Sequence, residues 1–185
     1  MDDINSVSGV LNKKVKLRIK DTAITLKIVS WLQIVGGITG VFLMAKLLLQ
    51  TGTINGPLLF IILIGISLFI FSFYVGKKLL TEKDKIAGIR LSLLNQALQL
   101  FHFKLIGLGF SYSAGASFLL GVKGLSIDFN FFIITSSFQM TIFTEGEYYF
   151  KINFLAVLLI IVLYDIYNEK RQLAHSVLND LEKIA

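Results

Sequence analysis

Two long apolar blocks, separated by a short uncharged connection, constrain this chain more than any other feature. They run from Ile28 to Leu49 and from Leu58 to Gly76, and Lys46 is the one charged residue within them. About 20 apolar residues are enough for a helix to cross the roughly 30 Å of hydrocarbon in a bilayer. We therefore expect transmembrane helices over residues 28–49 and 58–76, joined as a hairpin by Gln50–Gly56.

Basic residues gather at both outer ends of this hairpin, and they indicate its orientation. Loops rich in Lys and Arg stay in the cytoplasm, so we expect a multi-pass membrane protein with a cytoplasmic N-terminus. The same placement explains the net charge of +6 without any nucleic-acid partner. The flanking cations are Lys13, Lys14, Lys16, Arg18, Lys20 and Lys27 before the hairpin, and Lys77, Lys78, Lys83, Lys85 and Arg90 after it.

In the leader that precedes the hairpin, apolar residues alternate with cations. A strand and a disordered basic arm both fit this pattern. In either form the cations are candidate contacts to anionic lipid headgroups, each worth about 1 kcal/mol near the surface. The candidates are Lys14, Lys16, Arg18 and Lys20.

Residues 85–100 follow a helical pattern, with apolar residues at spacings of three and four. A second face carries the candidate polar residues Ser92, Asn95, Gln99 and His102. Such a face can line a wet cavity or bind a polar ligand. An amphipathic helix at the membrane surface gives the same pattern with no ligand at all.

Residues 101–149 alternate with the period of two that is typical of strands. Small residues alternate with larger ones between Leu105 and Phe118, and a bend is expected near Ser113–Gly115 because glycine weakens strands. Further alternating runs occupy 125–133, 137–142 and 148–153, which predicts an antiparallel β-meander. The competing interpretation is a transmembrane helix over 104–122, which would give a four-helix transmembrane bundle with an extramembrane β-hairpin.

The last apolar block, residues 150–167, is just long enough to cross a bilayer as a helix. If 148–153 is strand, only about 14 apolar residues remain, and a buried or re-entrant element becomes an alternative to a span. Residues 168–185 form an amphipathic tail. We expect one membrane-embedded α+β unit over 1–185, with three or four spans left open.

No catalytic constellation accompanies this architecture. The chain has no cysteine, and its two histidines, His102 and His175, have no carboxylate or second histidine at metal-ligand spacing. No dinucleotide or P-loop fingerprint occurs. We expect neither enzymatic activity nor a cofactor or metal.

The sequence therefore favours a small non-enzymatic polytopic membrane protein, either an accessory subunit or a protein-binding module. Its partners would be the bilayer and its anionic headgroups, together with another membrane protein or a second copy, since strand edges permit β-augmentation. One alternative is an oligomeric channel or transporter component that uses the face of Asn95, Gln99 and His102. Another is a lipid- or quinone-binding enzyme subunit, indicated only by the richness in aromatic residues.

Overall fold

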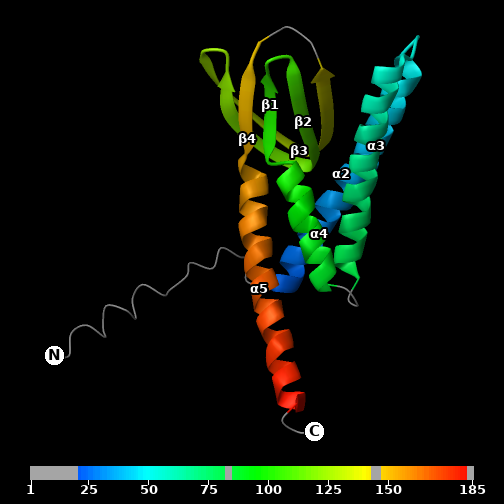
Figure 1. Ribbon diagram of the computed structural model, residues 1–185. Helices are drawn as coiled ribbons and strands as arrows, with labels where there is room; N and C mark the ends of the chain where they lie inside the picture. The colour runs from blue at the N-terminus through cyan, green and yellow to red at the C-terminus, as the bar shows by residue number, and fades with distance from the viewer. Residues whose placement is uncertain (1–20, 82–84, 143–146, 183–185) are drawn as a thin grey trace, which may run out of the picture.

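The computed structural model describes residues 21–81, 85–142 and 147–182, and within these ranges the chain is an α+β fold of four helices and one four-stranded antiparallel sheet (Figure 1). The predicted order of helical hairpin, short helix, antiparallel sheet and C-terminal helix is confirmed. The predicted leader strand, with Lys14, Lys16, Arg18 and Lys20, lies outside the described residues. The elements are α2 (Thr22–Gln50), α3 (Gly56–Leu80), α4 (Lys85–Leu98), β1 (Phe101–Leu105), β2 (Leu108–Lys123), β3 (Ser126–Ile142), β4 (Tyr149–Asn153) and α5 (Phe154–Glu182).

The α2–α3 hairpin extends beyond the apolar blocks because its caps lie outside them. The Asp21 carboxylate accepts a hydrogen bond from the Ala23 amide at 2.8 Å, and the Asn55 side chain accepts one from the Leu58 amide at 2.9 Å. Both helices are long and apolar enough to cross a membrane. At 1.5 Å per residue they measure about 43 and 37 Å.

The C-terminal helix differs from its prediction at both ends. Residues 149–153 belong to β4, and α5 begins at Phe154 rather than at residue 150. The Asn153 side chain lies at the change of structure, where it accepts a hydrogen bond from the Ala156 amide at 3.3 Å. The helix then continues to Glu182, so no boundary separates the predicted helix 150–167 from the predicted tail 168–185.

The sheet is not the simple meander that we expected. Its strand order is β1-β4-β2-β3, and β1 also pairs with the start of β2. Strand β4 therefore returns between β1 and the far half of β2, a long-range pairing that local alternation does not encode. The interpretation of 104–122 as a helix is wrong, because most of this segment is β2.

Strands β2 and β3 form one long hairpin that bends in the middle. Gly115 adopts a φ of 98°, the ladder shifts register between Gly115 and Ala116, and Ile134 on the opposite strand has a φ of 57°. The bend confirms the expectation for Ser113–Gly115. It also explains why the two predicted runs 125–133 and 137–142 are halves of a single strand, β3.

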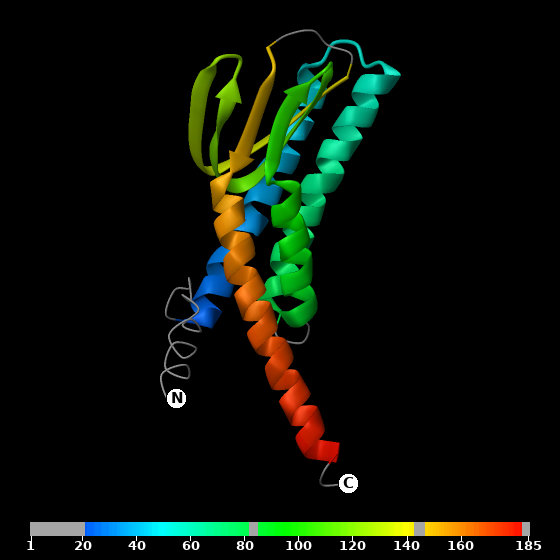
Figure 2. The same cartoon turned by 60° about the vertical axis from the view of Figure 1, so that its left-hand side comes forward.

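The sheet stands above α4 and α5 and beside the upper half of the α2–α3 hairpin (Figures 1 and 2). The C-terminal end of α4 leads into β1, and β4 leads into α5. Both helices therefore join the sheet at the same end of its strands. Two apolar cores result. The lower core joins the four helices and comprises Leu26, Val29, Leu79, Ile89, Leu163 and Ile166, and the upper core joins the hairpin to the sheet and comprises Met44, Phe69, Tyr112 and Ala114.

Candidate functional site

The four residues of the predicted polar face, Ser92, Asn95, Gln99 and His102, are all buried. The first three lie on α4 or just beyond it, and His102 is the second residue of β1. Their side chains contact α2, α3 and β2 of the same chain. They are therefore not exposed on the surface of α4.

The helical part of this cluster ties three helices to the sheet. The Ser92 hydroxyl donates to the Gln33 side-chain oxygen at 3.2 Å, and the Asn95 amide donates to the Ser72 hydroxyl at 3.2 Å. The Tyr112 hydroxyl lies 3.3 Å from the Asn95 side-chain oxygen. Asn95 thus joins α4 to both α3 and β2, in a place where an unpaired amide would be costly.

The second part of the cluster fixes the junction between α4 and the sheet. The Gln99 side-chain oxygen accepts a hydrogen bond from the Ala114 amide at 2.9 Å, next to the bend in β2. One ring nitrogen of His102, Nδ1, lies 2.6 Å from the Ser111 hydroxyl, and the other, Nε2, lies 3.2 Å from the Gln99 carbonyl oxygen. These bonds set the direction in which β1 leaves the helix.

The partners Gln33, Ser72 and Tyr112 were not predicted as site residues. Gln33 and Ser72 lie within the two long apolar blocks, and both are fully buried. A polar side chain inside an apolar helix is costly unless it is paired. The presence of Gln33 and Ser72 in the apolar blocks therefore indicated that each has a partner, but the sequence did not say which residue the partner is.

Asn95→Ala is expected to lower the free energy of unfolding by about 1–2 kcal/mol, since it removes the hydrogen bonds that join α4 to α3 and β2. The Ser72 and Tyr112 hydroxyls keep their bonds to backbone carbonyl oxygens, which limits the loss. The matched control is Leu94→Ala on the same helix, because Leu94 is exposed. Unfolding of the purified protein in detergent, followed by circular dichroism, measures both. Equal stability of the two variants would contradict the bridging role of Asn95.

The two faces of the sheet differ sharply in polarity, as strand alternation and register establish. One face is polar or small at most positions, and we call it the inner face because His102, Ser113, Ser117 and Asn153 on it are buried. The outer face is apolar at nearly every position. Its residues include Phe101, Phe103, Leu105, Phe110, Tyr112, Phe118, Leu120, Val122, Ile127, Phe129, Phe131, Ile133, Phe138, Met140, Phe150 and Ile152.

An ion pair crosses the inner face. The Lys151 ammonium lies 2.6 Å from the Asp128 carboxylate and 2.8 Å from the Asn130 side-chain oxygen. Gly121 is paired with both Lys151 and Asp128, so it occupies the strand between them. Because glycine has no side chain, the Lys151 side chain can reach over it.

Part of the outer face packs against the helices. The Tyr112 ring lies 5.4 Å from the Phe69 ring of α3, and the Ser136 hydroxyl donates to the Gly36 carbonyl oxygen of α2 at 2.6 Å. The part of this face that carries Ile127, Phe129 and Phe131 is exposed among the described residues. The exposed fractions are 80% for Ile127, 69% for Phe129 and 59% for Phe131. A sheet in water buries its apolar face and exposes its polar one, whereas membrane β-barrels expose the apolar face to lipid.

Strand β3 is also an open edge. It pairs with β2 along Ser126–Ile142, and no other strand or loop of the described chain forms a backbone hydrogen bond with it. Its charged residue Asp128 points to the inner face, toward Lys151. Apart from Asp128 and the irregularity at Ile134, β3 carries none of the charges or prolines that usually protect an edge strand.

No family model matches this chain, and the comparisons with curated proteins and with solved structures found no match either. Within the described residues, no three His, Asp or Glu side chains gather as metal ligands. The arguments for function therefore come from the polar cluster, the two faces of the sheet and the β3 edge.

Proposed function

We propose that this chain is a non-enzymatic polytopic membrane protein whose sheet lies at the depth of the bilayer and binds a strand of another polypeptide along β3. The exposed edge of the sheet carries the proposal. Its edge strand β3, 17 residues long, exposes apolar side chains and forms backbone hydrogen bonds with a strand on one side only.

The dimensions of the fold support this placement of the sheet. Helix α4 and strand β1 together span about 38 Å, at 1.5 Å per helical residue and roughly 3.3 Å per strand residue. Helix α3, beside them, is about 37 Å long by the same measure. A bilayer that covers the α2–α3 hairpin therefore covers the sheet as well (Figure 2).

The charges support a cytoplasmic position for the lower end of the molecule. Lys27, Lys77 and Lys85 lie where α2 begins, α3 ends and α4 begins, and these points share one end of the fold (Figure 1). Helix α5 also descends to this end. In this arrangement α4, the sheet and α5 form one re-entrant unit, so the beginning of α2 and the end of α5 both lie on the cytoplasmic side.

The open edge supports a partner. Water is absent from the hydrocarbon region, so each unpaired backbone amide or carbonyl costs several kcal/mol there, and lipid-exposed sheet edges do not occur. A strand from a second copy or from another membrane protein would satisfy these groups by β-augmentation. The buried hydrogen bonds of Asn95, Gln99 and His102 argue against a channel formed between copies of the chain at that face.

Photo-crosslinking in native membranes tests the proposal. A benzophenone side chain at Phe131 or Ile133 on β3 is expected to give one discrete protein adduct. Its mass should be twice that of the chain if the partner is a second copy, or the mass of the chain plus that of one other protein. The matched control is Phe101, which lies on the same outer face but on β1, a strand already paired on both sides. If the β3 positions yield only lipid adducts, as Phe101 should, then the binding role of the edge is wrong.

A further inference from the structure

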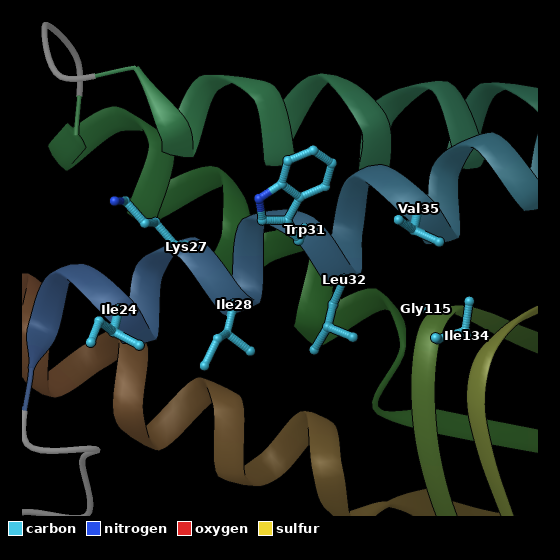
Figure 3. A pocket seen from close by; sticks show the side chains of 8 residues that line it. All are labelled: Ile24, Lys27, Ile28, Trp31, Leu32, Val35, Gly115 and Ile134. Atoms are coloured by element: carbon cyan, nitrogen blue, oxygen red, sulfur yellow. The ribbon is translucent and has the colours of Figure 1, made fainter.

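An apolar groove lies between α2 and the bend of the sheet, away from both the polar cluster and the β3 edge partner (Figure 3). Its volume is about 480 Å³, within the roughly 300–1,000 Å³ that is usual for small-molecule sites. Helix α5 passes along its other side (Figure 3). The lining residues are Ile24, Lys27, Ile28, Trp31, Leu32, Val35, Gly115 and Ile134.

The groove has one charged end and an apolar body. Lys27 is its only charged lining residue, and this lysine has no ion-pair partner among the described residues. From Lys27 to Val35 the groove follows α2 for about 12 Å, at 1.5 Å per residue. At its far end Gly115 and Ile134, the two bend residues, close it.

In the proposed bilayer, the charged end of the groove lies at the depth of the headgroups and its apolar body at the depth of the acyl chains. Lys27 lies at the basic end of the fold, where lipid headgroups would be, and Val35 lies two turns deeper along the helix. Trp31, between them, is 58% exposed, as suits an aromatic residue at the boundary of headgroups and acyl chains.

The chemistry of the groove lining indicates which kind of molecule it can hold. The lining is apolar apart from the Lys27 ammonium and the Trp31 indole N–H. A single acyl chain needs no hydrogen bonds from such a lining. The charge at the end favours an anionic headgroup over a zwitterionic one.

We propose that this groove binds an anionic phospholipid of the cytoplasmic leaflet, with its phosphate at Lys27 and one acyl chain along Ile28, Trp31 and Val35. The proposal rests on the membrane location proposed above but is independent of the β3 partner. The groove should select lipids by the charge of the headgroup and not by the type of acyl chain, because only its headgroup end carries a charge.

Trp31 is the single tryptophan of the chain, so its fluorescence reports directly on the groove. The full-length protein is reconstituted in phosphatidylcholine vesicles that contain a small fraction of lipid brominated on its acyl chains, which quenches tryptophan on contact. Brominated phosphatidylglycerol is expected to quench Trp31 at a mole fraction about fivefold lower than brominated phosphatidylcholine, the preference that one lysine gives near a membrane surface.

Lys27→Gln is expected to abolish this preference while leaving quenching itself intact. Lys46→Gln is the matched control, because Lys46 is an exposed lysine near the other end of α2 and should leave the preference unchanged. Equal quenching by both lipids in the unsubstituted protein would overturn the lipid site but leave the membrane location standing. Absence of quenching by either lipid, in protein that floats with the vesicles, would show that protein fills the groove and would also overturn it.

Discussion

Gly36→Val is expected to destabilise the protein by at least about 3 kcal/mol and to reduce sharply the yield of folded chain, since it overpacks a contact between two backbones. A Cβ at Gly36 would lie 2.2 Å from the Gly115 nitrogen and 2.3 Å from the Ala114 carbonyl carbon. Both are backbone atoms of β2, so neither can move unless the strand itself shifts. Helix α2 would have to separate from the sheet.

Gly52→Val is the matched control for this prediction. Gly52 lies in the connection between α2 and α3, and a Cβ there would meet nothing within 4 Å. Both variants are compared by thermal unfolding in detergent, monitored by circular dichroism. If they unfold at the same temperature, α2 does not pack on the bend as closely as described.

Lys151→Met is expected to cost about 3 kcal/mol, near the lower limit for breaking a buried ion pair, because it leaves the Asp128 carboxylate on the inner face without its cation. The two side chains are only 13% and 27% exposed, so water compensates poorly for the loss. Adding Asp128→Asn to Lys151→Met should recover at least about 1 kcal/mol, since the double variant no longer holds an unpaired charge.

The control for these two variants is Lys123→Met in the same sheet. Lys123 pairs with Glu147 at 2.8 Å, but these side chains are 48% and 70% exposed, so its loss should change stability little. Chemical unfolding gives the free energy of unfolding of the unsubstituted protein, Lys151→Met, the double variant and Lys123→Met. A double variant no more stable than Lys151→Met would mean that the ion pair does not hold the inner face together.

The helices and strands were largely predictable because their periodicities are local. The two apolar blocks gave α2 and α3, and the period of two between Leu105 and Phe118 gave most of β2 and its bend at Gly115. The strand order was not predictable, because β4 reaches its place between β1 and β2 through long-range pairing. Alternation likewise defines two faces of a sheet but does not say which one turns inward.

The candidate site was predictable in part for a similar reason. Helical spacing placed Ser92, Asn95 and Gln99 on one face of the predicted helix 85–100, but their partners on α2, α3 and β2 depend on how these elements pack. Close packing of α2 had its own signal in Gly36 and Gly40, small residues four apart, which allow another backbone to approach. Their actual neighbours, the bend of β2 and the Phe69 ring, come only from the fold.

The central claim is that the outer face of the sheet contacts the hydrocarbon of a bilayer, and spin labelling tests it most directly. The chain has no cysteine, so single cysteines at Phe129 on β3, Leu63 on α3 and Leu125 in the β2–β3 turn can be labelled cleanly. Collision of each nitroxide with oxygen, which concentrates in lipid, is compared with collision with a water-soluble nickel complex. We expect the label at Phe129 to behave like that at Leu63, open to oxygen and shielded from nickel, while Leu125 remains open to nickel. A label at Phe129 that collides with nickel as freely as the one at Leu125 would place the sheet in water and contradict the account.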